Sequence, residues 1–145
     1  MNFVDLFGLK IDWGKFVLKN PIVRAELQGL NDAIVATGKS DDSFTIRVTG
    51  GDRYLFECSE QGPVVVSATN HKTVPNSNPN KSPHLVERGA RAVDLKYDGI
   101  TEELFDKVLK GKTKFQSLAT RSDYDDGHTH ISLPNLKKYY YKPKK

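Results

Sequence analysis

The chain has 145 residues, of which 37% are hydrophobic and 28% charged, a composition that predicts one soluble globular domain and excludes a disordered chain. It contains no apolar run of membrane-spanning length, and its first residues lack the basic and apolar segments of a secretory signal, so we expect synthesis in the cytoplasm without a signal peptide. Five lysines and no acid lie in residues 137–145. The remainder is nearly neutral, with 17 basic and 18 acidic residues, which argues against specific nucleic-acid binding.

The first regular element that the sequence predicts is an amphipathic helix. Asn20 is a suitable N-cap, Pro21 suits the first helical position, and Gly38 is a natural C-terminal stop. Between them, apolar residues recur at spacings of four, three and four positions, which places them on one face: Val23, Leu27, Leu30 and Ile34.

Runs of apolar residues, some of them alternating with polar ones, predict five strands, at 44–49, 54–58, 64–66, 92–95 and 129–133. A loop rich in Asn, Pro and Ser spans 70–83, and a second helix is expected over 101–110. This order predicts an α+β fold with a mostly antiparallel sheet and flanking helices. We expect the domain to cover 1–136 and to be followed by the Lys/Tyr-rich tail 137–145.

Two short motifs contain the residue types of a metal centre. The first is Ser82-Pro83-His84, followed by Gly89 and Ala92-Val93-Asp94, and the second is His128-Thr129-His130. Two histidines and a carboxylate are ligands of catalytic zinc sites, in which the fourth position is left to water. Because alternate side chains of a strand share a face, both late histidines are expected to point to the same side.

Together these motifs resemble those of the zinc D-alanyl-D-alanine carboxypeptidases and phage L-alanyl-D-glutamate endopeptidases, a family whose fold is shared with the hedgehog signalling domain. The resemblance covers 44–133 and implies Zn²⁺ bound by His84, Asp94 and His130. His128 would then stabilise the oxyanion. His128 also stays open as the alternative ligand, because some phage endopeptidases have an Asp-x-x-His motif at this place.

The resemblance also assigns two residues to substrate binding. Arg53 ends the segment 48–53, which is similar to a Val-Thr-Ser-Gly-Tyr-Arg motif of the family, and its guanidinium is expected to hold a substrate carbonyl or carboxylate. Ser82 is expected to support the metal loop or the bound ligand. The segment between His84 and Asp94 is three residues longer than is usual in the family.

A metal-bound water needs a general base to take its proton. Asp125 and Asp126 are the carboxylates nearest to the second motif. Asp125 is preferred if His128 is the ligand. Asp126 is preferred if His130 is the ligand.

The resulting hypothesis is a zinc metallopeptidase that hydrolyses a peptide bond in the stem peptide of peptidoglycan. Without a signal peptide or a separate wall-binding domain, it resembles a phage endolysin that acts at the bacterial cell wall during host lysis. The tail 137–145 has two interpretations. Its lysines are attracted to an anionic envelope surface, or its tyrosines pack back on the domain.

Two other functions are compatible with the sequence. His71 and His130 each begin a His-x-(Ser/Thr)-apolar motif, the paired motif of metal-independent two-histidine phosphoesterases, in which one histidine acts as base and the other as acid. The second alternative is a non-catalytic structural or binding relative of the zinc peptidases. An open metal position would distinguish catalysis from a purely structural metal.

Overall fold

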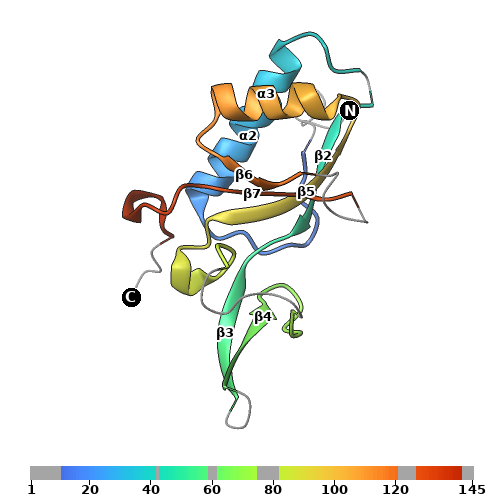
Figure 1. Cartoon of the computed structure of the whole chain (residues 1–145). Helices are drawn as coiled ribbons and strands as arrows, with labels where there is room; N and C mark the ends of the chain where they lie inside the picture. The colour runs from blue at the N-terminus through green and yellow to red at the C-terminus, as the bar shows by residue number, and fades with distance from the viewer. Residues whose placement is uncertain (1–10, 42, 59–61, 75–81, 121–126, 142–145) are drawn as a thin grey trace.

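A five-stranded sheet with two helices packed on it forms the body of the computed structural model, which describes residues 11–41, 43–58, 62–74, 82–120 and 127–141 (Figure 1). The helices are α2 (Pro21–Ala36) and α3 (Glu102–Lys112). The strand order is β1-β2-β5-β7-β6. These strands are β1 (Ile11–Asp12), β2 (Thr45–Gly50), β5 (Ala92–Asp98), β7 (Thr129–Ser132) and β6 (Gln116–Ala119).

The fold is α+β with a mixed sheet. β1 runs parallel to β2, whereas the other neighbouring strands are antiparallel. β1 and β6 were not predicted from the sequence. Among the described residues, no helix is long and apolar enough to cross a membrane.

Helix α2 forms as its sequence predicts. The Asn20 side chain accepts a hydrogen bond from the backbone N–H of Ile22 at 2.9 Å, and Pro21 occupies the first helical position. The predicted apolar face is fully buried. In α3, the Thr101 hydroxyl caps the N-terminus by accepting the Leu104 N–H.

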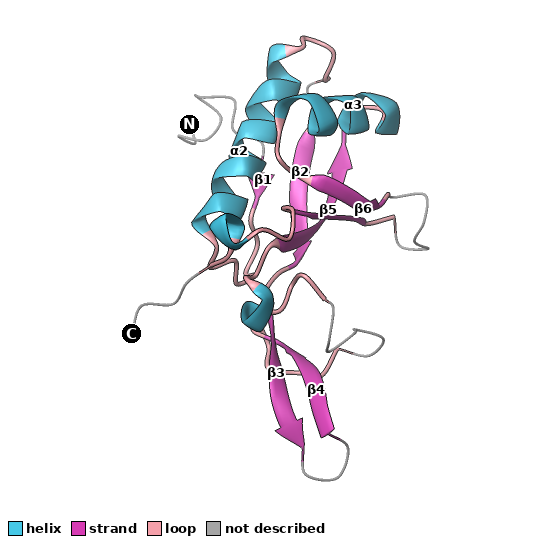
Figure 2. Ribbon diagram, turned by 60° about the vertical axis from the view of Figure 1, so that its left-hand side comes forward, coloured by secondary structure: helices cyan, strands magenta, loops and turns pink. Residues whose placement is uncertain are grey.

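The helices cover one face of the five-stranded sheet (Figure 2). This face is apolar, whereas the outer face is polar. Side chains alternate between the two faces along each strand. On β2, β5 and β7, the residues that pack with the helices in the core are Ile46, Val48, Val93, Leu95, Tyr97 and Ile131. The residues between them therefore project from the outer face: Arg47, Asp94, Lys96 and His130.

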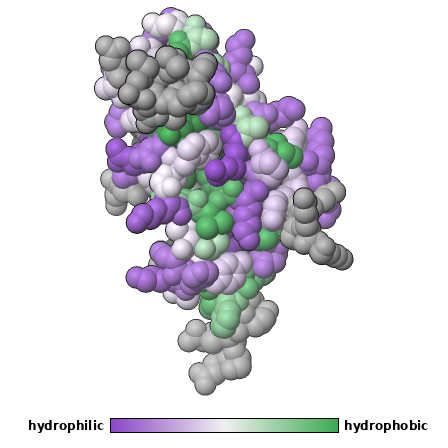
Figure 3. Space-filling model, turned by 180° about the vertical axis from the view of Figure 1, so that it is seen from behind, coloured by the Kyte–Doolittle hydropathy of each residue, from purple (hydrophilic) through white to green (hydrophobic). Residues whose placement is uncertain are grey.

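A second, two-stranded sheet extends away from the body (Figures 1 and 2). It is the hairpin of β3 (Arg53–Cys58) and β4 (Gly62–Ser67), two of the predicted strands. Phe56 on this hairpin is 58% exposed, and apolar surface is visible at this end of the molecule (Figure 3). The base of β3 is anchored to the body, because the Arg53 N–H donates to the His84 carbonyl at 2.9 Å.

The start of the Lys/Tyr-rich tail packs on the domain. Tyr139, at the end of the short 3-10 helix η2 (Lys137–Tyr139), belongs to the buried core. The Asn20 side-chain amide donates to the carbonyls of both Tyr139 and Gly89, and the Tyr141 N–H also donates to Gly89. The long segment between His84 and Asp94, which contains the 3-10 helix η1 (Val86–Arg88), is thereby tied to α2 and to the chain end.

Truncation separates the two interpretations of the tail. Cutting after Leu136 removes the buried Tyr139 ring and one partner of Asn20, so we expect the free energy of unfolding to fall by about 3 kcal/mol or more. Cutting after Tyr141 is the matched control and should leave stability unchanged. Urea unfolding of the three proteins measures this, and equal midpoints for the two truncated proteins would contradict the packing of Tyr139 as a stabilising contact.

Asp52 is a buried carboxylate next to the base of the hairpin. It is 1% exposed, its Oδ2 accepts the Lys19 N–H at 2.8 Å, and its own N–H donates to the Val17 carbonyl at 2.7 Å. Burial raises the pKa of Asp52 to about 6, and the bond from Lys19 offsets this only in part. Asp52 therefore joins the segment before α2 to the turn that leads into Arg53.

This raised pKa predicts a pH-dependent stability. Between about pH 4 and pH 6 the folded protein keeps the Asp52 proton while the unfolded chain loses it, so the contribution of Asp52 to stability falls as pH rises, by about 3 kcal/mol. Asp52→Asn removes this dependence. Unfolding free energies of both proteins are measured in urea from pH 4 to 7. The value for the variant minus the value for the wild type should increase as pH rises through this window. Parallel pH profiles would show that Asp52 is not the responsible group.

Candidate metal centre

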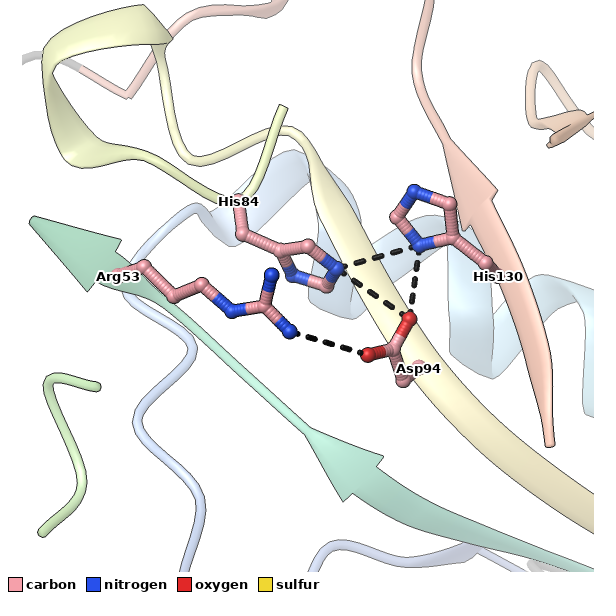
Figure 4. Close-up of polar contacts among 4 residues, drawn as sticks. All are labelled: Arg53, His84, Asp94 and His130. Atoms are coloured by element: carbon pink, nitrogen blue, oxygen red, sulfur yellow. Dashed lines mark hydrogen bonds and ion pairs between the residues drawn. The ribbon is translucent and has the colours of Figure 1, made fainter. Parts of the chain in front are cut away.

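Three side chains from separate segments converge on the outer face of the sheet (Figure 4). Asp94 lies in β5 and His130 in β7, and the two residues are directly opposite in the β5–β7 register. His84 comes from the turn before η1, and its ring reaches over β5 toward both. Antiparallel pairing of β5 and β7 thus brings together residues that are 36 positions apart in sequence.

The spacing of the ligand atoms fits a small tetrahedral metal ion. The distance from His130 Nδ1 to Asp94 Oδ1 is 2.7 Å, and His84 Nε2 lies 3.2 Å from each of these atoms. In a tetrahedral zinc site with bonds of about 2.0–2.1 Å, ligand atoms lie about 3.3–3.4 Å apart. The two distances from His84 are close to this value, whereas His130 Nδ1 and Asp94 Oδ1 would have to move apart, and with this adjustment the three residues could hold a metal ion.

The centre is closed on one side and reaches solvent on the other. His84 is 1% exposed and Asp94 is 8% exposed. The His130 side chain is 16% exposed and lies at the rim. His130 is therefore the candidate ligand through which the centre reaches solvent.

The electrostatics of the cluster favour the protonation states that metal ligands need. Burial alone would raise the pKa of Asp94, but hydrogen bonds from the rings of His130 and His84 outweigh burial and hold that pKa well below its usual range. Burial lowers the pKa of His84, although the Asp94 carboxylate opposes this shift. At pH 7 Asp94 is ionised and His84 is neutral, as metal binding requires.

Arg53 supports two of the three candidate ligands. Its guanidinium Nη2 lies 3.5 Å from Asp94 Oδ2, the oxygen that does not face the histidines. Its backbone N–H donates to the His84 carbonyl, and it forms a parallel bridge with Leu85. The Arg53 side chain is 20% exposed, so it is also accessible to a ligand at this face.

Gly50 leaves room for the Asp94 carboxylate. The two residues are paired in the β2–β5 register, next to an irregularity between Val48 and Gly50. A Cβ at position 50 would lie 2.7 Å from Asp94 Oδ2, too close for a non-bonded contact. The absence of a side chain at Gly50 thus lets Asp94 turn toward the histidines.

The other residues that the sequence assigned to the site lie outside the group of candidate ligands or outside the described residues. Ser82 is buried, and its carbonyl accepts the Leu85 N–H at 3.2 Å in the turn that presents His84. His128 precedes β7 and is half-buried, outside the cluster of possible ligands. Asp125 and Asp126 lie outside the described residues.

The two-histidine alternative gains no geometric support from the described residues. His71 is exposed, and its Nδ1 lies 3.2 Å from the Tyr54 hydroxyl beside the hairpin. His130 Nδ1 instead contacts Asp94. His71 is not part of the His84, Asp94 and His130 group.

Comparisons with protein-family models, with curated proteins and with solved structures gave no match to this chain.

Substitution of the ligands tests metal binding directly. Wild-type protein incubated with zinc and then dialysed should retain one equivalent of metal. Asp94→Asn keeps the shape of the side chain but removes its charge, so we expect at least a tenfold loss of zinc affinity, and His84→Ala should also lose the metal. His71→Ala, at an exposed histidine outside the cluster, is the matched control. One retained equivalent in both Asp94→Asn and His84→Ala, by elemental analysis of protein with unchanged circular dichroism, would exclude this centre.

Proposed function

We propose that the protein is a zinc-dependent peptidase that hydrolyses a peptide bond in the stem peptide of peptidoglycan. The observation that carries this proposal is the group of ligand atoms from His84, Asp94 and His130, which has the size of a tetrahedral zinc site and a solvent-facing rim. The choice of zinc and of a peptide substrate rests on the resemblance of the two sequence motifs to the zinc peptidase family.

Bound zinc would lower the pKa of a coordinated water to about 7 and polarise the scissile carbonyl. The protein supplies the ligands and their orientation. Arg53 holds the outer oxygen of Asp94, which fixes the carboxylate toward the two histidines. Because the guanidinium is planar and has several N–H donors, Arg53 can also orient a carbonyl or carboxylate of the substrate.

The proton-transfer roles in this proposal follow from the sequence. Asp125 or Asp126 takes the proton from the attacking water and delivers it to the leaving amine. With His130 as the ligand, Asp126 is the preferred base. His128, adjacent to the ligand strand, stabilises the developing oxyanion.

The proposed place of action is the bacterial cell wall, as for an endolysin. Lysines at the chain end, in 137–145, are proposed to add attraction to the anionic envelope. This attraction is independent of the chemistry and is expected to weaken as salt screens the charges.

Digestion of purified peptidoglycan tests the proposed activity. Zinc-loaded wild-type protein should release stem-peptide fragments whose masses identify the cleaved bond, and a chelator should abolish their release. Substituting the true base, Asp125→Asn or Asp126→Asn, should lower turnover about a hundredfold or more while zinc content stays at one equivalent. Asp98→Asn, an exposed aspartate on β5, is the control.

The absence of any cleaved fragment with fully zinc-loaded wild-type protein would contradict the proposed peptidase activity. Full activity in the presence of chelator would contradict the role of the metal. Full activity of both Asp125→Asn and Asp126→Asn would exclude these residues as the base.

A further inference from the structure

Two cationic side chains lie opposite each other on the face that carries the metal centre. Arg47 in β2 pairs with Lys96 in β5 in the antiparallel register. Each lies between core-facing residues of its strand, so both project from the outer face together with Asp94. Arg47 is exposed and Lys96 is partly exposed.

This pair is unfavourable for the fold by itself. Like charges directly opposite each other on neighbouring strands destabilise a sheet. Among the described residues, no ion pair within 4 Å joins Arg47 or Lys96 to a carboxylate. Asp12 is the register partner of Arg47 across the β1–β2 pair, and its Oδ1 accepts the Gly14 N–H. Asp98 lies one outward-facing position beyond Lys96, at the end of β5.

The position of the pair relates it to the metal centre. Lys96 is two residues from Asp94 on the same face of β5, a separation of about 7 Å along the strand. One residue of an extended peptide spans about 3.3–3.6 Å. A substrate whose scissile carbonyl lies at the metal would therefore bring a group one or two residues away from that bond to Arg47 and Lys96.

We propose that Arg47 and Lys96 form a carboxylate-binding subsite of the metal centre, and that the substrate carries a carboxylate one or two residues from the cleaved bond. This inference rests on the proposed peptidase function and narrows its substrate class. A free α-carboxylate on an internal acidic residue and a carboxylate at the peptide terminus both have the required chemistry. The experiment below distinguishes these two sources.

Three synthetic stem peptides provide the probes. The first, L-Ala-γ-D-Glu-L-Lys-D-Ala, has both carboxylates free, the second has the α-carboxylate of D-Glu amidated, and the third has the C-terminus amidated. Binding to the zinc-loaded full chain is measured by calorimetry at low salt, and hydrolysis by initial rates. We expect one of the amides to bind about tenfold more weakly than the free acid, and this amide identifies the carboxylate that the subsite holds.

The double variant Arg47→Gln with Lys96→Gln should reduce that preference to about twofold or less through weaker binding of the acid. Its zinc content should be unchanged, and its stability equal or slightly higher, because the repulsion between the two cations is removed. Lys110→Gln, at an exposed lysine on α3, is the matched control and should keep the full preference. The preference of the wild type should shrink in high salt.

Equal affinity of the wild type for the acid and both amides would overturn the proposed subsite, as would a preference that survives in the double variant. The experiment distinguishes failure of the proposed subsite from failure of the proposed peptidase activity. If no peptide is hydrolysed but the acid preference is present and is lost in the double variant, the subsite stands and the peptidase activity fails. If peptides are hydrolysed without any acid preference, the activity stands and the subsite fails.

Discussion

The contact between Asp94 and the two histidine rings is the interaction on which the rest of the site depends. Asp94 Oδ1 lies within hydrogen-bonding distance of ring nitrogens of both His130 and His84, and Asp94 Oδ2 faces the guanidinium of Arg53. A carboxylate buried to this extent needs such partners, because an unpaired buried charge is strongly unfavourable. The same contacts hold the two ring nitrogens about 3 Å apart, which is the arrangement that a metal ion requires.

The fold makes this polar cluster possible by separating the two faces of one sheet. The residues on either side of Asp94 in β5 pack under α2 and α3, so the backbone that carries the ligand is rigidly held by the core. The loop between His84 and Asp94 is tied down by Asn20 and by the end of the chain at Tyr139 and Tyr141. These contacts fix the position of His84, although the loop is three residues longer than is usual in the zinc peptidase family. On the outer face, the neighbouring cations Arg47 and Lys96 extend the polar surface away from the metal centre.

Local patterns predicted the helices and five of the strands, because caps and periodicity are encoded by residues near one another, as in the helix that follows Asn20. β1 and β6 were not predicted, because neither strand has enough residues or apolar side chains to give a local pattern. β1 has only two residues, and β6 has a single large apolar residue, Leu118, which is exposed. The choice of the three candidate ligands came from the resemblance of the two sequence motifs to those of the zinc peptidase family, and the structure brings these three side chains together. The space provided by Gly50 and the like-charged pair on β2 and β5 became visible only with the strand register, which depends on contacts between distant parts of the chain.

The most direct test of the central claim is the position of zinc in the folded protein. A crystal structure of the zinc-loaded chain, with anomalous data collected at the zinc absorption edge, would locate the ion without reliance on activity. The predicted result is one zinc peak at about 2.0–2.2 Å from His84 Nε2, Asp94 Oδ1 and His130 Nδ1, with a non-protein ligand in the fourth position. An ion bound elsewhere, with Asp94 still hydrogen-bonded to both histidines, would contradict the account.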